Sequence, residues 1–110
     1  MYIGKEYVDT CKKAVALLSK QDLNGKSMSS DPAYNLAAQL MAAVLNVQAG
    51  AGICPSAATA INQAQALLTK YNFNGSGSYT SGANKFSAAD AALANQLANT
   101  LDLYNNNKLC

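Results

Sequence analysis

The sequence contains no histidine, arginine or tryptophan, and only 13% of its 110 residues are charged. All eight positive charges are lysines, and they stand beside six carboxylates to give a net charge of +2. Proteins that bind duplex nucleic acid usually present a dense basic face in which arginine is prominent. Scattered lysines do not make such a face, so we expect no nucleic-acid partner.

Long hydrophobic runs are also missing. No apolar stretch approaches the roughly 20 residues that a membrane-spanning helix needs, so we expect no membrane insertion. No export signal is visible, and we interpret the leading residues Met1–Gly4 as an addition to the start of the chain. A length of 110 residues suits one domain with one core, covering residues 1–110.

The absence of histidine removes the commonest partner of a serine or cysteine nucleophile. The carboxylates have structural interpretations instead: Asp31 and Asp90 at helix starts, Asp9 paired with lysines one turn later, Asp22 and Asp102 near helix ends. The segment Asp22-Leu23-Asn24-Gly25 has too few oxygen ligands for a calcium loop. We therefore predict that the protein is not an enzyme, with no catalytic residue, cofactor or metal.

What the sequence does contain is an internal repeat. Residues 14–25 (AVALLSKQDLNG) match residues 64–75 (AQALLTKYNFNG) at seven of twelve positions. A weaker match relates residues 36–40 to residues 93–97. Each half therefore reads as a helix, a polar loop and a second helix, with pseudo-repeats near 5–48 and 55–104. Two such hairpins predict an all-α fold, a four-helix up-down bundle.

Hydrophobic residues recur at helical spacing in four segments, near residues 5–21, 31–48, 55–71 and 87–104. The predicted core faces are Tyr7, Cys11, Ala14, Val15 and Leu18; Leu36, Leu40, Ala43, Val44 and Val47; Ile61, Ala64, Leu67, Leu68 and Tyr71; and Leu93, Leu97, Leu101 and Tyr104. The opposite faces carry lysines and amides and are expected to meet solvent.

Residues that are typical of helix starts and ends support the same helix boundaries. Asp31 before Pro32 predicts an N-cap followed by proline at the first helical position. The segment 87–90, Ser-Ala-Ala-Asp, resembles a capping box with aspartate in place of the usual glutamate. Gly25 and Gly75 are predicted to end their helices, since glycine adopts the left-handed conformation easily.

The central segment resembles a module that recurs in large modular secreted or surface proteins of bacteria. The similarity lies in residues 34–47 (YNLAAQLMAAVLNV), the following Ala49-Gly50-Ala51 and Cys54, and the closing residues 101–106 (LDLYNN). This helical, alanine- and asparagine-rich family has no activity known to us. The resemblance therefore implies an extracellular or cell-surface location, with neighbouring domains of a longer protein as partners.

The three cysteines are Cys11, Cys54 and Cys110, and no C-x-x-C pair or histidine completes a zinc site. In an up-down bundle the fourth helix returns the chain to the end where the third begins. We therefore predict a Cys54–Cys110 disulfide, in the oxidising compartment that the resemblance implies. Cys11 is expected to be a buried thiol, and a Cys11–Cys110 pair is the rival.

Two classes of function remain. The first is a non-catalytic structural or spacer module of an extracellular bacterial surface protein. The second is a recognition module that binds a glycan or a protein through loops 24–30 and 74–86, which the bundle places at one end. The candidate residues for binding are Tyr79, Ser78, Asn74 and Asn84. We favour Tyr79 as an anchor of its loop over a platform for a sugar ring, because a lone aromatic is a weak signal for a site.

Overall fold

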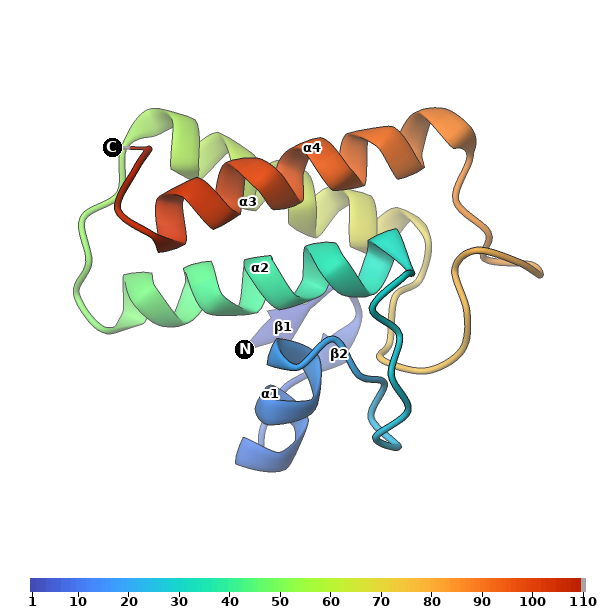
Figure 1. The fold of residues 1–110 in the computed structure, drawn as a ribbon. Helices are drawn as coiled ribbons and strands as arrows, with labels where there is room; N and C mark the ends of the chain where they lie inside the picture. Colours follow the sequence, from blue (N-terminus) through green and yellow to red (C-terminus); the bar gives the residue numbers. More distant parts are fainter. Residues whose placement is uncertain (110) are drawn as a thin grey trace.

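The computed structural model describes residues 1–109, and four helices form most of it. Figure 1 shows α2, α3 and α4 packed side by side, with α1 and a small β-hairpin against α2. The elements are β1 (Tyr2–Ile3), β2 (Glu6–Tyr7), α1 (Cys11–Leu18), α2 (Pro32–Gln48), α3 (Pro55–Lys70) and α4 (Ala88–Asn105). The predicted helical class is confirmed. The structure does not establish two equal up-down hairpins, because α1 has only eight residues and lies below α2, steeply inclined to it, in Figure 1.

The first eight residues differ from the prediction. The predicted helix from residue 5 is wrong, since β1 and β2 pair antiparallel with Tyr2 opposite Tyr7 and Ile3 opposite Glu6. The turn uses Gly4 at φ +60°, a conformation that costs glycine little. Ile3 is fully buried in the hydrophobic core. The leading residues, which the sequence analysis left outside the predicted helices, are therefore part of the packed fold.

A glutamine from α3 holds the hairpin in place. The Gln65 side chain accepts the backbone N–H of Gly4 at 2.9 Å and donates to the carbonyl of Tyr2. Beside it, the N–H of Lys5 donates to the carbonyl of Phe73 at 2.8 Å. A Cβ on Gly4 would lie 3.0 Å from both Cβ and the carbonyl oxygen of Phe73. Only glycine lets the turn approach this closely.

Helix α1 buries a different face from the predicted one. Val15 is 60% exposed, and Tyr7, Cys11 and Leu18 are exposed as well, whereas Leu17 is 1% exposed. The helix begins only at Cys11, after the N-cap Thr10, so it has about two turns with which to cover α2. It packs Ala16 and Leu17 inward. The prediction that Cys11 is buried is therefore wrong: it is an exposed free thiol.

The apolar faces predicted for the other three helices are confirmed in their central turns. Exposure rises only toward the ends, where Val47 and Leu93 reach 36% and 37%. The buried members of the three faces are Leu36, Leu40 and Ala43 on α2, Ala64, Leu67 and Leu68 on α3, and Leu97, Leu101 and Tyr104 on α4. Together with the hairpin they form the main hydrophobic core.

Both predicted helix starts are confirmed. The Asp31 carboxylate accepts the N–H of Ala33 at the beginning of α2, with Pro32 in the first turn. The Ser87 hydroxyl accepts the N–H of Asp90 at the beginning of α4. Each of these oxygens satisfies one of the amides that a helix start leaves without an intrahelical partner.

The prediction that Gly25 and Gly75 end their helices is wrong, whereas the predicted end of the third helix near residue 71 is confirmed to within one residue. Helices α1 and α3 end at left-handed Lys20 and Asn72, both at φ +58°, before Gly25 and Gly75 are reached. The N–H of Gln21 bonds to the carbonyl of Ala16, and that of Phe73 to Leu68, as in a Schellman motif. The two glycines do have positive φ, +85° and +79°, but they shape the loops beyond.

Candidate functional site

The two predicted loops lie side by side at one end of the molecule (Figure 1). The N–H of Leu23 donates to the carbonyl of Gly75 at 2.9 Å, which joins the loops by their backbones. The N–H of Tyr79 donates to the buried carboxylate of Asp31 at 2.8 Å. The loops are thus tied both to each other and to the start of α2.

Aromatic rings fill the space beneath the loops. The Tyr79 ring centroid lies 5.3 Å from that of Phe73, 5.8 Å from Tyr34 and 6.1 Å from Phe86. These distances and tilted orientations suit favourable aromatic pairs. Tyr79 is 1% exposed, so its ring anchors the loop and presents no face on which a sugar could stack.

The hydroxyl groups of this cluster are also used internally. Tyr34 donates to the carbonyl of Gly77 at 2.8 Å, and the Tyr79 hydroxyl contacts the side chain of Asn74 at 3.3 Å. Burial raises the pKa of Tyr34 and that of Tyr79 above the ordinary value of 10.0. Both rings therefore stay neutral and hold the loop backbone as hydrogen-bonding groups.

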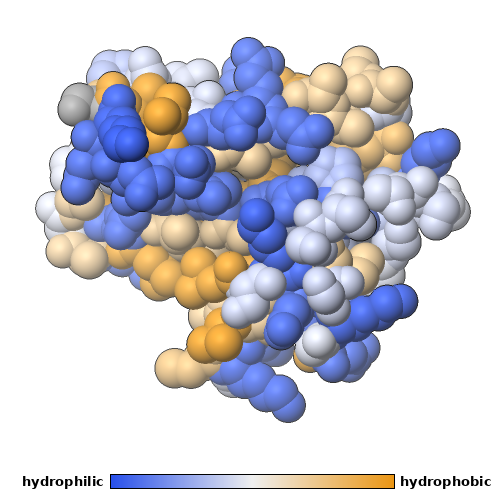
Figure 2. All heavy atoms as spheres, in the orientation of Figure 1, coloured by the Kyte–Doolittle hydropathy of each residue, from blue (hydrophilic) through white to orange (hydrophobic). Residues whose placement is uncertain are grey.

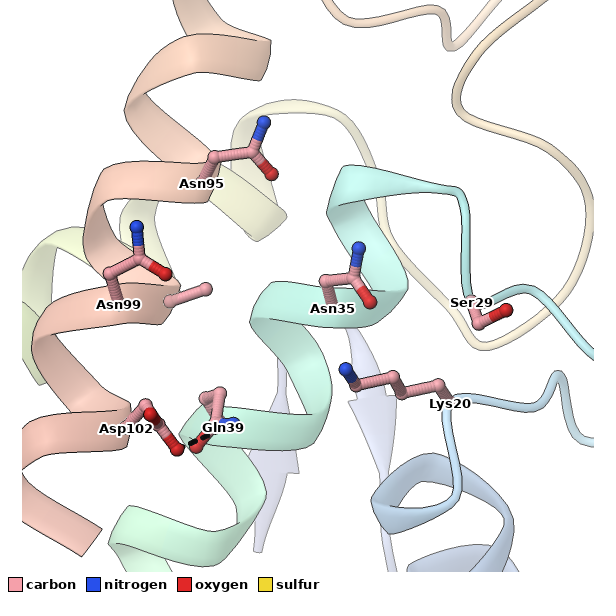
Figure 3. A pocket seen from close by; sticks show the side chains of 8 residues that line it. Lys20, Ser29, Asn35, Gln39, Asn95, Asn99 and Asp102 are labelled. Atoms are coloured by element: carbon pink, nitrogen blue, oxygen red, sulfur yellow. Dashed lines mark hydrogen bonds between the residues drawn. The ribbon is translucent and has the colours of Figure 1, made fainter. Parts of the chain in front are cut away.

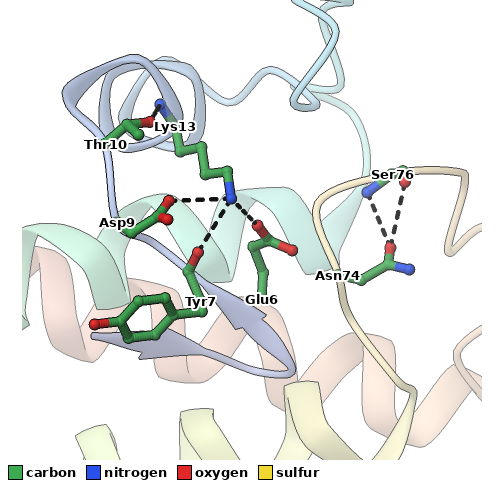
Figure 4. A network of polar contacts seen from close by, with 7 residues as sticks. All are labelled: Glu6, Tyr7, Asp9, Thr10, Lys13, Asn74 and Ser76. Atoms are coloured by element: carbon green, nitrogen blue, oxygen red, sulfur yellow. Dashed lines mark hydrogen bonds and ion pairs between the residues drawn. The ribbon is translucent and has the colours of Figure 1, made fainter.

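The other predicted binding residues do not converge on one point. Asn74 bonds to Tyr79 and accepts the N–H of Ser76 at 3.1 Å (Figure 4). Ser78 pairs with the hydroxyl of Thr80 at 3.0 Å. Asn84 is exposed, and none of the described residues bonds to its side chain. The structure therefore brings Asn74 and Tyr79 together but leaves Ser78 and Asn84 as separate polar groups.

Two carboxylates are buried, and both serve the backbone. Asp22 Oδ1 accepts the N–H groups of Asn24 and Lys26, each at 2.9 Å, which closes the turn at residues 22–26. Asp31 caps α2 and holds Tyr79. Among residues 1–109, no group of three or more acidic, cysteine or histidine side chains is placed to bind a metal ion.

A lysine joins the hairpin to α1 (Figure 4). Lys13 Nζ lies 3.0 Å from Glu6 and 3.2 Å from Asp9, and it donates to the carbonyl of Tyr7. The hydrogen bond to Glu6, followed by that to Asp9, raises the pKa of Lys13. The predicted pairing of Asp9 with Lys13 is confirmed, whereas the contribution of Glu6 depends on the hairpin that the sequence did not predict.

The capping box of α4 contains a third member. The Tyr71 hydroxyl accepts the N–H of Ser87 at 3.1 Å and donates to Asp90 Oδ2 at 2.6 Å. In an ordinary capping box the acidic side chain bonds directly to the backbone N–H of the N-cap residue, and here the Tyr71 hydroxyl stands between the two groups. Lys70 Nζ approaches the same carboxylate oxygen at 2.8 Å. The hydrogen bond from Lys70 is the larger cause, and that from Tyr71 the smaller, of the lowered pKa of Asp90.

The most distinctive polar surface is a cleft between α2 and α4. Figure 2 shows hydrophilic residues spread over this face, and Figure 3 shows Asn35 and Gln39 of α2 facing Asn95, Asn99 and Asp102 of α4. The cleft has a volume of about 540 Å³, within the range of about 300–1,000 Å³ typical of small-ligand sites. Lys20, Ser29 and Ala98 complete its lining. We call this surface the amide cleft.

One end of the amide cleft is closed by hydrogen bonds. Gln39 bonds to Asp102 at 3.4 Å, and Asn105 Nδ2 donates to Gln39 Oε1 at 2.9 Å. Further along, Asn46 donates to Asn105 at 3.0 Å. These bonds connect α2 to the last turns of α4, so this part of the seam is satisfied internally.

The other end is open. Within the described residues, no hydrogen bond reaches the side chains of Asn95 or Asn99. Asn35 Oδ1 is a buried side-chain atom to which no donor among residues 1–109 bonds. Lys20 reaches toward α2 from the end of α1 (Figure 3). This end therefore combines unpaired amides with one cation, and it contains no nucleophile and base in contact.

No protein-family model, curated protein or solved structure matches this chain. Across the described residues, no helix is both long and apolar enough to cross a membrane. The assignment of a function therefore depends on the geometry of the loops and of the amide cleft.

The amide cleft was not predicted, although the predicted exposure of Asn95 and Asn99 is confirmed. A signal was available in the spacing. Polar residues recur at i, i+4 and i+11 on α2 as Asn35, Gln39 and Asn46. On α4 and its C-cap residue they recur at i, i+4, i+7 and i+11, beginning at Asn95 and ending at the C-cap Asn106. Such spacing puts the residues on one face of each helix, although it does not say that the two faces meet.

Proposed function

We propose that the protein is a non-catalytic structural or spacer module of an extracellular bacterial surface protein, with neighbouring domains of that protein as its partners. The observation that carries the proposal is the inward-facing aromatic cluster at the loop end. Tyr79, Phe73 and Phe86 are all buried there. Loops built for recognition commonly present aromatic side chains outward, where they can make contact with a partner.

The internal ties of the loops also favour a structural role. Leu23, Tyr34 and Asp31 each contribute a hydrogen bond to the segment 75–79. The loops therefore unite the ends of the helices into one packed unit. Recognition of a glycan or protein through loops 24–30 and 74–86 is less well supported, since their largest ring is unavailable to a ligand.

The extracellular location rests on the resemblance of residues 34–47 to modules of exported proteins, and the predicted Cys54–Cys110 disulfide is compatible with that location. Cys54 and Leu109 both pack against the hydrophobic core. Cys110 itself lies outside the described residues, so the pairing stays a prediction. The two-fold relation between residues 5–48 and 55–104 likewise stays a prediction.

Native-state hydrogen exchange tests the structural role. If the loops belong to the cooperative unit, the amides of Leu23 and Tyr79 exchange with the same free energy as amides in the middle of α2 and α4. Exchange of these two amides by local opening, far faster than in the helices, would contradict the proposal. A glycan-array and pull-down screen adds a second arm, with a Ser78→Ala, Asn84→Ala variant as the matched control. Specific binding lost in that variant would support the loop-recognition function instead.

A further inference from the structure

We propose that the open end of the amide cleft is a binding site for a neutral saccharide. The proposal does not rest on the structural role, because the cleft lies between α2 and α4 and away from the packed loops. Its main residues are Asn35, Asn95 and Asn99, with Lys20 at the entrance from α1.

The first argument is the unsatisfied acceptor. Asn35 Oδ1 is buried without a partner, whereas buried polar atoms in folded proteins nearly always have one. Leaving such an atom unpaired costs free energy, and an apolar residue of the same size would avoid that cost. A hydroxyl group that enters the cleft supplies the missing donor when the amide turns toward it.

The second argument is the chemistry of the lining. A side-chain amide both donates and accepts hydrogen bonds, as does each hydroxyl of a sugar. The open end offers three such amides and the Ser29 hydroxyl, while the only charges in the lining are Lys20 and Asp102. Lys20 is the one charge at the open end, because Asp102 lies at the closed end and bonds to Gln39. A lysine ammonium donates to neutral hydroxyls as well as to anions, and the three amides beside it suit a ligand with many hydroxyls.

The third argument concerns affinity. No tyrosine or phenylalanine lines the cleft, so a bound sugar gains no stacking on a ring. Polar contacts in an open groove compete with water and contribute little net free energy each. We therefore expect a dissociation constant of about 1 mM, at the weak end of specific binding.

An NMR titration of the isotope-labelled protein tests the proposal. The probes are glucose, galactose, mannose and N-acetylglucosamine and their β-linked disaccharides, with glycine and inorganic phosphate as zwitterionic and anionic comparisons. The side-chain amide signals of Asn35, Asn95 and Asn99 should shift together with at least one sugar and yield one dissociation constant. No response of these signals to any of the sugars, or a response to glycine or phosphate alone, would overturn the proposal.

Three variants separate binding from folding. Asn35→Leu should weaken sugar binding at least tenfold while raising the urea midpoint, because it removes the unpaired acceptor. Asn99→Leu changes an exposed residue, so it should fold normally and also bind at least tenfold more weakly. Asn62→Leu, on the exposed face of α3, is the matched control and should bind as the original protein does. Unchanged binding in both cleft variants would show that the sugar binds elsewhere.

Discussion

The backbone amide of Tyr79 donates to Oδ2 of Asp31 at 2.8 Å, across 48 positions of the chain. The other oxygen of the same carboxylate caps α2 through Ala33. One side chain, 2% exposed, thus fixes both the start of α2, the helix with the most buried residues, and the path of the longer loop.

Replacing this carboxylate is expected to be costly. The Asp31→Ala variant loses an N-cap and leaves the Tyr79 amide buried without an acceptor, so we expect the free energy of unfolding to fall by about 3 kcal/mol. Urea denaturation followed by circular dichroism measures the change. The matched control is Ser87→Ala, which removes the exposed cap of α4 and a long contact with the Tyr71 hydroxyl and should cost about 1 kcal/mol. Equal losses in the two variants would show that the bond to Tyr79 contributes nothing.

The two Asn-Gly steps of the repeat differ in their tolerance of a side chain. A Cβ on Gly25 would meet no atom within 4 Å, whereas one on Gly75 would lie 2.7 Å from Leu23 Cγ. Gly25→Ala should therefore cost only the left-handed strain, about 1 kcal/mol. Gly75→Ala should cost about 2–3 kcal/mol, since it adds overpacking to that strain.

The Leu23→Ala background tests the steric explanation, because it removes the atoms that the new methyl group would meet. In that background, the cost of Gly75→Ala should fall toward the cost of Gly25→Ala, which a double-mutant cycle measures as a coupling. A cost that is the same with and without Leu23 would assign the effect to backbone strain alone.

The ion pair at the start of α4 should be visible in the titration of Asp90. Lys70 and Tyr71 hold its pKa in the folded protein below the ordinary value of 3.8. Because the folded pKa is the lower one, the stabilisation is fully present above the unfolded pKa. It is lost as pH falls through the folded pKa. Carboxyl NMR of Lys70→Met should show the pKa of Asp90 rising, and by more than in Tyr71→Phe, since Lys70 is the larger cause. No rise in either variant would refute this assignment.

The cysteines give a prediction that needs only chemical labelling. Cys11 is an exposed free thiol, so one equivalent of a thiol reagent should react with the native protein at that residue. Non-reducing peptide mapping should recover Cys54 linked to Cys110. That loop closure would stabilise the fold by roughly 4 kcal/mol, less any strain. Recovery of Cys11 in any disulfide peptide would show the predicted pairing to be wrong.

The helical class, three of the four apolar faces and both helix starts could be predicted, because each depends on neighbours within a few residues. Asp31 before Pro32 marks a helix start by local chemistry alone. The prediction that Gly25 and Gly75 end the helices fails because segments 14–25 and 64–75, identical at seven of twelve positions, end their helices at non-equivalent positions, Lys20 and Asn72. A contact over a long sequence separation, such as Leu23 with Gly75, shapes the segments beyond those stops.

The core face of α1 and the β-hairpin could not be predicted for a related reason. The apolar spacing that begins at Tyr7 is regular, but Ile3 occupies the core in its place, through a turn that needs Gln65 and Phe73. The amide cleft likewise forms only when α2 and α4 meet. Spacing along one helix identifies a polar face, and only tertiary packing turns two such faces into a site.

The glutamine that holds the hairpin has a mechanical consequence. A pulling force applied at Met1 would break three hydrogen bonds in sequence. They are the two that Gln65 makes with the hairpin and the one from the Val8 amide to the Met1 carbonyl. The first eight residues would then extend to about 27 Å, at roughly 3.4 Å per residue. The force would reach the hydrogen bond between Asp31 and Tyr79 only through α1. Within a longer chain, this segment would extend under force before the helices unfold.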